Sequence, residues 1–392
     1  MEFYTVKCDA SAPRTVVADD MMLTRELPTS AGSRMLDGYV SLLEAEALTR
    51  LKSEGYSLVG KAKVGEFAFD VLGESSYGGA CVKDGALTYA TTEILKSGEA
   101  TVSLALDVNG APRRAAAQSG TVCVKPTYGT VSRFGTVPVA CSGETVSVSG
   151  LTADACAMAL SVIAGHDDKD GTSLPSSSIT KVSEASPVRR VAILSDMTDG
   201  EMAGATEEMK ASLTAMGVEV EYVSAGVIKS ANAAWNILMC AELCNNVSRY
   251  DGVKYGYRAE SFSGIDELYT NSRTEAFGTL LKTAILYGSD ALSTENYMKI
   301  YDKALRTRRV ICDAFSTLFE SYDAVMLPAA SVLSYKAEDI TAEDVFTENR
   351  FTAPASVTGL PAVVFGGVQF IGKAFSEMAM LKLAKAYEEV KR

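Results

Sequence analysis

The side chains that could act as nucleophiles, bases or metal ligands are thinly spread along the 392 residues. His166 is the only histidine, so a Ser-His-Asp or Cys-His mechanism would depend on that one imidazole. The 8 cysteines are dispersed and form no C-x-x-C pair. Cys240 and Cys244 lie one helical turn apart, but no histidine is near them, so the pair does not predict a metal site. We expect reduced, buried thiols, no metal and no cofactor.

A set of motifs is more informative than these scattered groups. Residues 120–135 read GTVCVKPTYGTVSRFG, which resembles the G-V-V-G-L-K-P-T-Y-G-R-V-S-R-Y/F-G signature of the amidase-signature family without a gap. Within that family, the chain is similar to the A subunits of glutamyl-tRNA(Gln) amidotransferase, the glutaminase half of that enzyme. The resemblance extends over nearly the whole chain, in a form with trimmed loops. Further matching segments are residues 60–68, 162–173, 249–258 and 359–373.

The resemblance implies both a fold and a chemistry. The implied fold is α/β, with a central mixed, twisted sheet covered by helices on both faces. We expect one amidase-like domain over residues 1–392, with a subdivision into a signature half, 1–175, and a C-terminal half, 188–392. The implied chemistry is attack by a serine on an amide carbonyl, with a lysine as the ultimate base and a second serine as the relay.

The positions of this triad hold no reactive side chains. In residues 107–116, DVNGAPRRAA, Ala111 stands where the family has its nucleophile. The run VVADD places Ala18 at the lysine position, and Leu87 takes the place of the relay serine, twenty-four residues before Ala111. A hydrocarbon side chain cannot attack an amide or accept a proton. The sequence therefore predicts a degenerate triad.

The oxyanion loop of the family is altered as well. Its glycines correspond to Val108, Asn109 and Gly110, and only Gly110 keeps the backbone freedom of glycine. Pro112 removes a further backbone donor at the start of the expected helix. We interpret the segment as a vestigial oxyanion loop that forms a tight turn.

Two positions could still bind a ligand. The resemblance implies that an arginine and an aspartate hold the α-carboxylate and α-amine of glutamine. Arg308 keeps the first position, whereas Asn349 replaces the aspartate. Because asparagine carries no negative charge, we expect weakened binding of an amino acid. The alternative interpretation of Arg308 is a helix-surface arginine or an internal ion pair.

Composition limits the classes of partner. The net charge is −12, with 49 acidic and 37 basic residues, which disfavours nonspecific binding of phosphate backbones. The short basic run of residues 306–309 does not change this expectation. No apolar run reaches the length of a membrane span and the first residues show no signal-peptide pattern, so we expect a cytoplasmic protein.

Alternating strand and helix patterns favour the α/β class. The predicted strands cover residues 188–194, 218–223 and 324–328. The predicted helices cover residues 201–216, 231–249, 296–322 and 376–391. Residues 173–187, rich in serine, have the composition of a linker.

These observations predict a catalytically inactive, amidase-like protein that serves as a structural or regulatory subunit of an amidase or amidotransferase-type complex, or as a homo-oligomer. Two alternatives stay open. One is an active amidase or glutaminase that uses a displaced serine, for which Ser75, Ser119 and Ser142 are the candidates. The other is a small-molecule sensor that binds an amino acid or its amide through Arg308.

Overall fold

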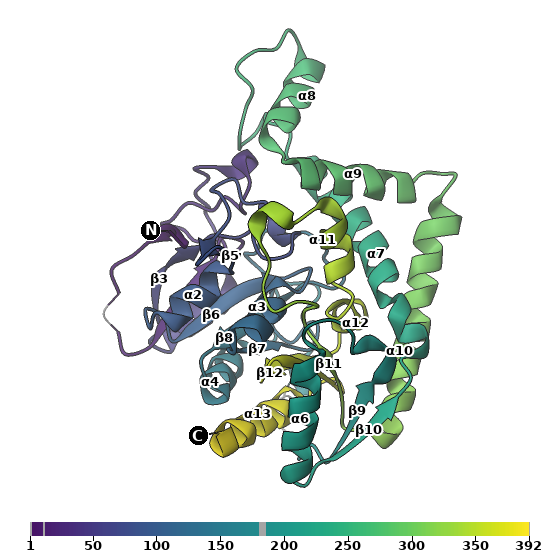
Figure 1. Ribbon diagram of the computed structural model, residues 1–392. Helices are drawn as coiled ribbons and strands as arrows, with labels where there is room; N and C mark the ends of the chain where they lie inside the picture. Colours follow the sequence, from purple (N-terminus) through teal and green to yellow (C-terminus); the bar gives the residue numbers. More distant parts are fainter. Residues whose placement is uncertain (1, 11, 180–185, 392) are drawn as a thin grey trace.

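The computed structural model describes residues 2–10, 12–179 and 186–391 (Figure 1). Its centre is an 11-stranded sheet with the strand order β1-β3-β2-β6-β8-β7-β12-β13-β11-β9-β10. A small hairpin of β4 and β5 lies apart from this sheet. The strands are β1 Tyr4–Lys7, β2 Thr15–Asp19, β3 Ser57–Ala62, β4 Val82–Lys83, β5 Ala86–Leu87, β6 Val102–Asp107, β7 Val122–Lys125, β8 Thr145–Gly150, β9 Arg190–Leu194, β10 Glu219–Val223, β11 Ala324–Pro328, β12 Ala362–Phe365 and β13 Val368–Gly372.

Strand pairing in this sheet is mixed. β2 runs parallel to both β3 and β6, whereas β8 is antiparallel to β6 and β7. β2, β6, β8 and β11 are buried along their whole length, which agrees with their nearly continuous runs of apolar and small residues. The sheet can be buried in this way because helices flank it, and the predicted mixed α/β class is confirmed.

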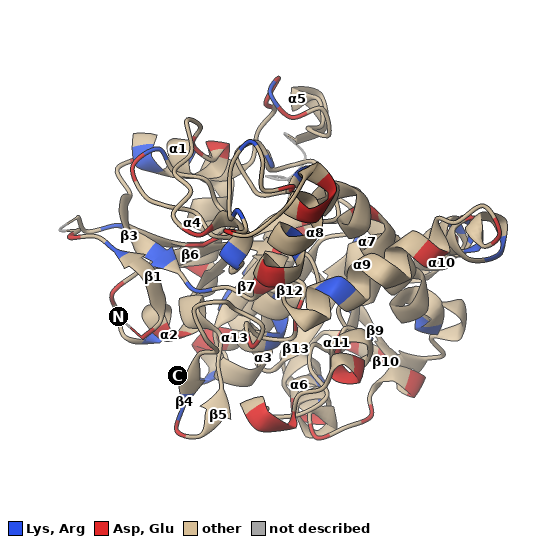
Figure 2. Cartoon of the chain, turned by 90° about the horizontal axis from the view of Figure 1, so that it is seen from above, with Lys and Arg blue, Asp and Glu red and all other residues tan. Residues whose placement is uncertain are grey.

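Helices α7, α9 and α10 pack together as one helical layer, and α8 projects away from the body (Figure 1). Acidic and basic residues are interspersed over the helices (Figure 2). Among the described residues, none of the helices combines the length and apolar composition that crossing a bilayer requires. The helices are α1 Glu46–Ser53, α2 Ala90–Lys96, α3 Ala111–Ser119, α4 Ala153–Ile163, α5 Ser176–Ile179, α6 Ala203–Ala215, α7 Ala231–Asn246, α8 Ile265–Ala276, α9 Thr279–Ala291, α10 Asp302–Ser321, α11 Ala342–Glu348, α12 Ala353–Thr358 and α13 Glu377–Lys391.

Most predicted elements are present close to their expected bounds, as β9, β10, β11, α6, α7 and α13. The predicted helix over residues 296–322 is wrong in one respect, because a π-helical turn, Tyr297–Tyr301, precedes α10. The expected linker contains the short helix α5, and its residues 180–185 lie outside the described part of the chain. The thiols need a correction too: all 8 are free, but only Cys81, Cys123, Cys156 and Cys240 are buried.

Candidate functional site

Two of the predicted site positions, Ala18 and Ala111, lie near the place where β2 and β6 end side by side. Ala18 pairs with Leu104 across these parallel strands. The Asp19 carboxylate then joins the two strand ends by accepting the N–H of Leu106 at 2.7 Å. Burial raises the pKa of this carboxyl to about 7, although the backbone N–H groups that it accepts work against the shift. β6 leads through residues 108–110 into α3, which begins at Ala111.

Leu87 reaches the core from a different element. It ends β5, and its N–H donates to the carbonyl of Tyr335 at 2.7 Å. Ala18, Leu87 and Ala111 are all buried in the main apolar core, at 0%, 4% and 4% exposure. The structure thus brings no hydroxyl or amine into that core at these three positions.

Tyr89 follows Leu87 by two residues and is buried in the same apolar core. Its ring is buried, and its hydroxyl has no hydrogen-bond partner among the described residues. Burial, and after it the charges of nearby carboxylates including Asp19 and Asp107, raise the pKa of the Tyr89 hydroxyl well above its ordinary value. The hydroxyl therefore stays protonated and cannot serve as a base at neutral pH.

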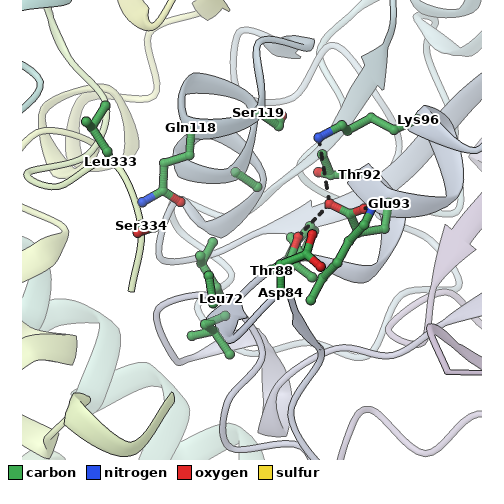
Figure 3. A pocket seen from close by; sticks show the side chains of 15 residues that line it. Leu72, Asp84, Thr88, Thr92, Glu93, Lys96, Gln118, Ser119, Leu333 and Ser334 are labelled. Atoms are coloured by element: carbon green, nitrogen blue, oxygen red, sulfur yellow. Dashed lines mark hydrogen bonds and ion pairs between the residues drawn. The ribbon is translucent and has the colours of Figure 1, made fainter. Parts of the chain in front are cut away.

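A cleft of about 340 Å³ opens next to Leu87, but neither Ala18 nor Ala111 lines it. In Figure 3, Glu93 lies within the cleft, close to Thr88 and Lys96. Its carboxylate accepts the hydroxyl of Thr88 at 2.8 Å and lies 4.0 Å from the ammonium of Lys96. The charged groups of the cleft are therefore largely engaged with one another.

The loop of residues 108–110, which the sequence predicts to be a vestigial oxyanion loop, is held by neighbouring side chains. The indole N–H of Trp235 donates to the carbonyl of Val108 at 3.2 Å. Arg114 donates to the carbonyl of Asn109 at 2.6 Å. Gly110 has a φ of 83°, and a Cβ there would lie 2.4 Å from the side chain of Thr352. Only glycine fits this tight turn, so the sequence-based interpretation of residues 108–110 as a turn agrees with the backbone.

A network of asparagine side chains occupies the space between this loop and α7. Asn349 is fully buried, and its amide donates to Asn109 at 2.6 Å and to Asn236 at 2.7 Å. Its carbonyl oxygen accepts the amide of Asn232. Asn232 and Asn236 also donate to the carbonyl of Phe346, at 2.8 and 2.7 Å. Since both amide hydrogens of Asn349 are in use, an incoming ligand would have to break this network.

Arg308 is hydrogen-bonded to Ser142, away from the asparagine network. Its guanidinium donates to the hydroxyl of Ser142 at 3.2 Å and to the carbonyl of Ser142 at 3.0 Å. Glu242 accepts the hydroxyl and the N–H of the same serine. Among the described residues, Arg308 and Asn349 share no hydrogen-bond partner. The two predicted ligand-binding residues thus take part in separate structural networks.

The hydroxyls of the candidate displaced serines are hydrogen-bonded to carboxylates or to other polar groups rather than to a described lysine or histidine. The Ser75 hydroxyl donates to Asp70 at 2.7 Å and accepts the N–H of Glu66, as a turn residue does. Ser119 contacts the hydroxyl of Thr121 at 3.1 Å. Ser142 is bound by Glu242 and Arg308 as above. Within the described ranges, no lysine or histidine forms a hydrogen bond with any of these three hydroxyls.

Several important residues escaped sequence reasoning. Arg113 and Arg114 are fully buried at the start of α3. Arg113 forms two hydrogen bonds with the carboxylate of Asp107, at 2.7 and 2.9 Å. Arg114 has no carboxylate partner within the described ranges and binds carbonyl oxygens, among them that of Val71 at 2.9 Å. The signal that could have revealed the asparagine network was the spacing of Asn232 and Asn236, one turn apart on a predicted helix.

The fold can be compared with those of known proteins. The chain belongs to the amidase family, because the family model "Amidase" matches residues 95–381. It is 33% identical over 400 residues to the A subunit of glutamyl-tRNA(Gln) amidotransferase from Symbiobacterium thermophilum, covering 96% of this chain and 82% of the relative. It is 31% identical over 410 residues to the same protein of Lachnoclostridium phytofermentans, with coverage of 96% and 83%.

A solved structure agrees with these relatives. The crystal structure of the corresponding glutamyl-tRNA(Gln) amidotransferase chain from Thermotoga maritima superimposes with a TM-score of 0.81 at 25% identity. The superposition covers 99% of this chain and 87% of the other. The resemblance noted from the motifs is therefore confirmed at the level of family and fold.

One prediction follows directly from the asparagine network. Asn349→Asp introduces a carboxylate and replaces two donor contacts with contacts between acceptor oxygens, at Asn109 and Asn236. We expect the free energy of unfolding to fall by about 2–4 kcal/mol, because two buried acceptors lose their donors. Denaturant unfolding measures this change, with Asn245→Asp as the control, because Asn245 lies on the exposed side of α7 and its substitution should change the free energy of unfolding by less than about 1 kcal/mol. An unchanged stability of Asn349→Asp would contradict the network.

Proposed function

We propose that this chain is a catalytically inactive member of the amidase family that acts as a structural or regulatory subunit of an amidase or amidotransferase-type complex. The observation that carries the proposal is the set Ala18, Leu87 and Ala111, all buried and none able to transfer a proton. As one domain in the cytoplasm, the chain would keep the scaffold of its family without the chemistry.

Two further observations support the loss of chemistry. The ring of Tyr89 is buried in the same apolar core as Leu87, and the amide groups of Asn349 are bound by neighbouring asparagines. In both cases, side chains fill the space around the predicted site positions. Hydrogen bonds and packing that depend on each other in this way favour a rigid core over an open site.

The relatives support the subunit role. They are named as one subunit of an amidotransferase, and this chain covers 82% of the length of the Symbiobacterium thermophilum relative. A chain that keeps the fold of such a subunit while its reactive groups are gone retains surfaces for a partner. The two alternatives have less support. For an active enzyme with a displaced serine, no described lysine forms a hydrogen bond with the candidate serines. For a sensor that binds an amino acid, Arg308 is already hydrogen-bonded to Ser142.

Glutamine hydrolysis tests the proposal. We expect the purified chain, alone and with any co-purifying partner, to release ammonia from glutamine about 10⁵–10⁶-fold more slowly than an active family member. An ammonia assay under single-turnover conditions has the required sensitivity. Hydrolysis that disappears in Ser75→Ala, Ser119→Ala or Ser142→Ala would overturn the proposal in favour of a displaced nucleophile.

A further inference from the structure

A shallow groove runs between α10, α7 and the 3₁₀ turn Gly226–Ser230 that precedes α7. Two adjoining hollows, of about 320 and 300 Å³, share Lys303 and Thr307 and so form one continuous groove. Its lining extends along the chain from Lys299 to Val310, which spans about 16 Å, or roughly three turns of a helix. The apolar lining residues are Val227, Ala233, Ala234, Ile237, Ile300, Ala304 and Val310.

The charge of this groove is opposite to that of the whole chain. Its lining includes Lys299, Lys303 and Arg306 and no acidic residue, although the chain carries a net charge of −12. Lys299 and Arg306 form exposed pairs with Glu295 and Asp302, at 3.7 and 2.8 Å. Such exposed pairs are weak and exchange readily. Lys303 forms no ion pair within the described ranges.

The groove also leaves apolar surface open to solvent. Val310 is 50% exposed at one end, and Met298, next to Lys299 at the other end, is 63% exposed. Exposed apolar surface with a polar and charged rim is typical of an interaction site. A groove that is three helical turns long, with an apolar floor, suits the apolar face of one amphipathic helix.

We propose that this groove, lined by residues from 227 to 310, binds an acidic amphipathic helix of the partner protein. Its apolar side chains would lie on Ile237 and Ile300, and its carboxylates would meet Lys299, Lys303 and Arg306. This inference rests on the proposed subunit function and assigns a surface to it. Complementary charge would both steer the association and fix the register of the helix.

Other occupants fit less well. Two copies of the chain could not pair groove to groove, because a symmetric contact of that kind brings like charges together. An RNA backbone would gain little from an apolar floor, and three cations are few for a phosphate chain on an acidic protein.

Charge reversal in the native host tests the groove. The tagged chain is purified as wild type, as Lys299→Glu/Lys303→Glu, and as the control Lys336→Glu/Lys382→Glu, whose lysines are likewise exposed and lie outside the groove. A photoreactive phenylalanine analogue at Thr307 identifies the segment that lies in the groove, by mass spectrometry of the cross-linked peptide. Thermal unfolding confirms that all variants fold.

We expect a partner to co-purify with wild type and control, and its recovery to fall about tenfold with Lys299→Glu/Lys303→Glu. The cross-link at residue 307 should reach a partner segment with apolar residues at helical spacing and several carboxylates. Equal recovery of the partner with wild type, the double variant and the control would overturn the groove proposal. A cross-link to RNA, to a second copy of the chain or to a basic segment would overturn it as well. Either result would leave the proposed subunit role intact. If no partner co-purifies even with wild type, the subunit role fails, and the groove proposal with it.

Discussion

Replacing Arg113 with alanine is expected to lower the free energy of unfolding by about 3–5 kcal/mol. The substitution leaves the carboxylate of Asp107 buried without its paired charge. It also removes the donors for the carbonyl of Thr352 at 2.8 Å, the side chain of Gln369 at 2.7 Å and the hydroxyl of Ser356 at 2.8 Å. Denaturant unfolding followed by circular dichroism measures the change.

Arg309→Ala serves as the matched control for this substitution. Arg309 lies on the exposed side of α10 and pairs with Asp313 at 3.0 Å, so its loss should cost less than about 1 kcal/mol. If Arg113→Ala gives no folded protein, Arg113→Lys gives the measurable version, because an ammonium cannot reproduce the bidentate pair. A stability of Arg113→Lys equal to that of wild type would refute the structural role of the pair.

Glu66→Gln is expected to stabilise the protein at pH 8 by up to about 3 kcal/mol relative to wild type and to have little effect near pH 4.5. Burial raises the pKa of the Glu66 carboxyl to about 7, although hydrogen bonds from Ser33 and Gly278 oppose the shift. Between the ordinary carboxyl pKa of 4.5 and about 7, the folded chain holds a proton that the unfolded chain has lost. The contribution of this group to stability is therefore complete below pH 4.5 and is lost as the pH rises through 7.

The glutamine side chain can keep both contacts. Its carbonyl accepts the N–H of Gly278, and its amide donates to the hydroxyl of Ser33, which now faces the carboxylate at 2.6 Å. Glu260→Gln serves as the control, because Glu260 is exposed. Denaturant unfolding curves of wild type and both variants at pH 4.5 and pH 8 give the stability differences to be compared. A Glu66→Gln difference of the same size at both values would contradict the buried, protonated carboxyl.

Local patterns predicted much of the fold. Residues 324–328 form an uninterrupted apolar run that ends in proline, and β11 has those same bounds. The motif alignment placed Ala111 at the start of a helix, and α3 begins there because Gly110 supplies the left-handed turn and Pro112 suits the first helical turn. These signals lie within a few residues of chain, so sequence alone could reveal them.

The asparagine contacts around residues 108–110 could not be predicted from such local patterns. Asn109 and Asn349 are 240 residues apart in the chain, and their contact depends on how three separate elements pack. The sequence left open whether Arg308 binds a ligand, lies on the helix surface or forms an internal ion pair; in the structure it binds Ser142, whereas its neighbour Arg309 pairs with an aspartate on the exposed side. The spacing of charged residues along a helix does not predict which of them forms a buried contact, because that depends on the neighbouring elements.

The asparagine network also limits how this lineage could change. Asn349 is bound to Asn109, Asn236 and Asn232, so removing any one of the four leaves buried polar atoms without partners. Any series of substitutions that opened the space between α7 and residues 108–110 would therefore pass through less stable intermediates. Selection for a well-folded chain would retain all four asparagines, whatever role the protein has.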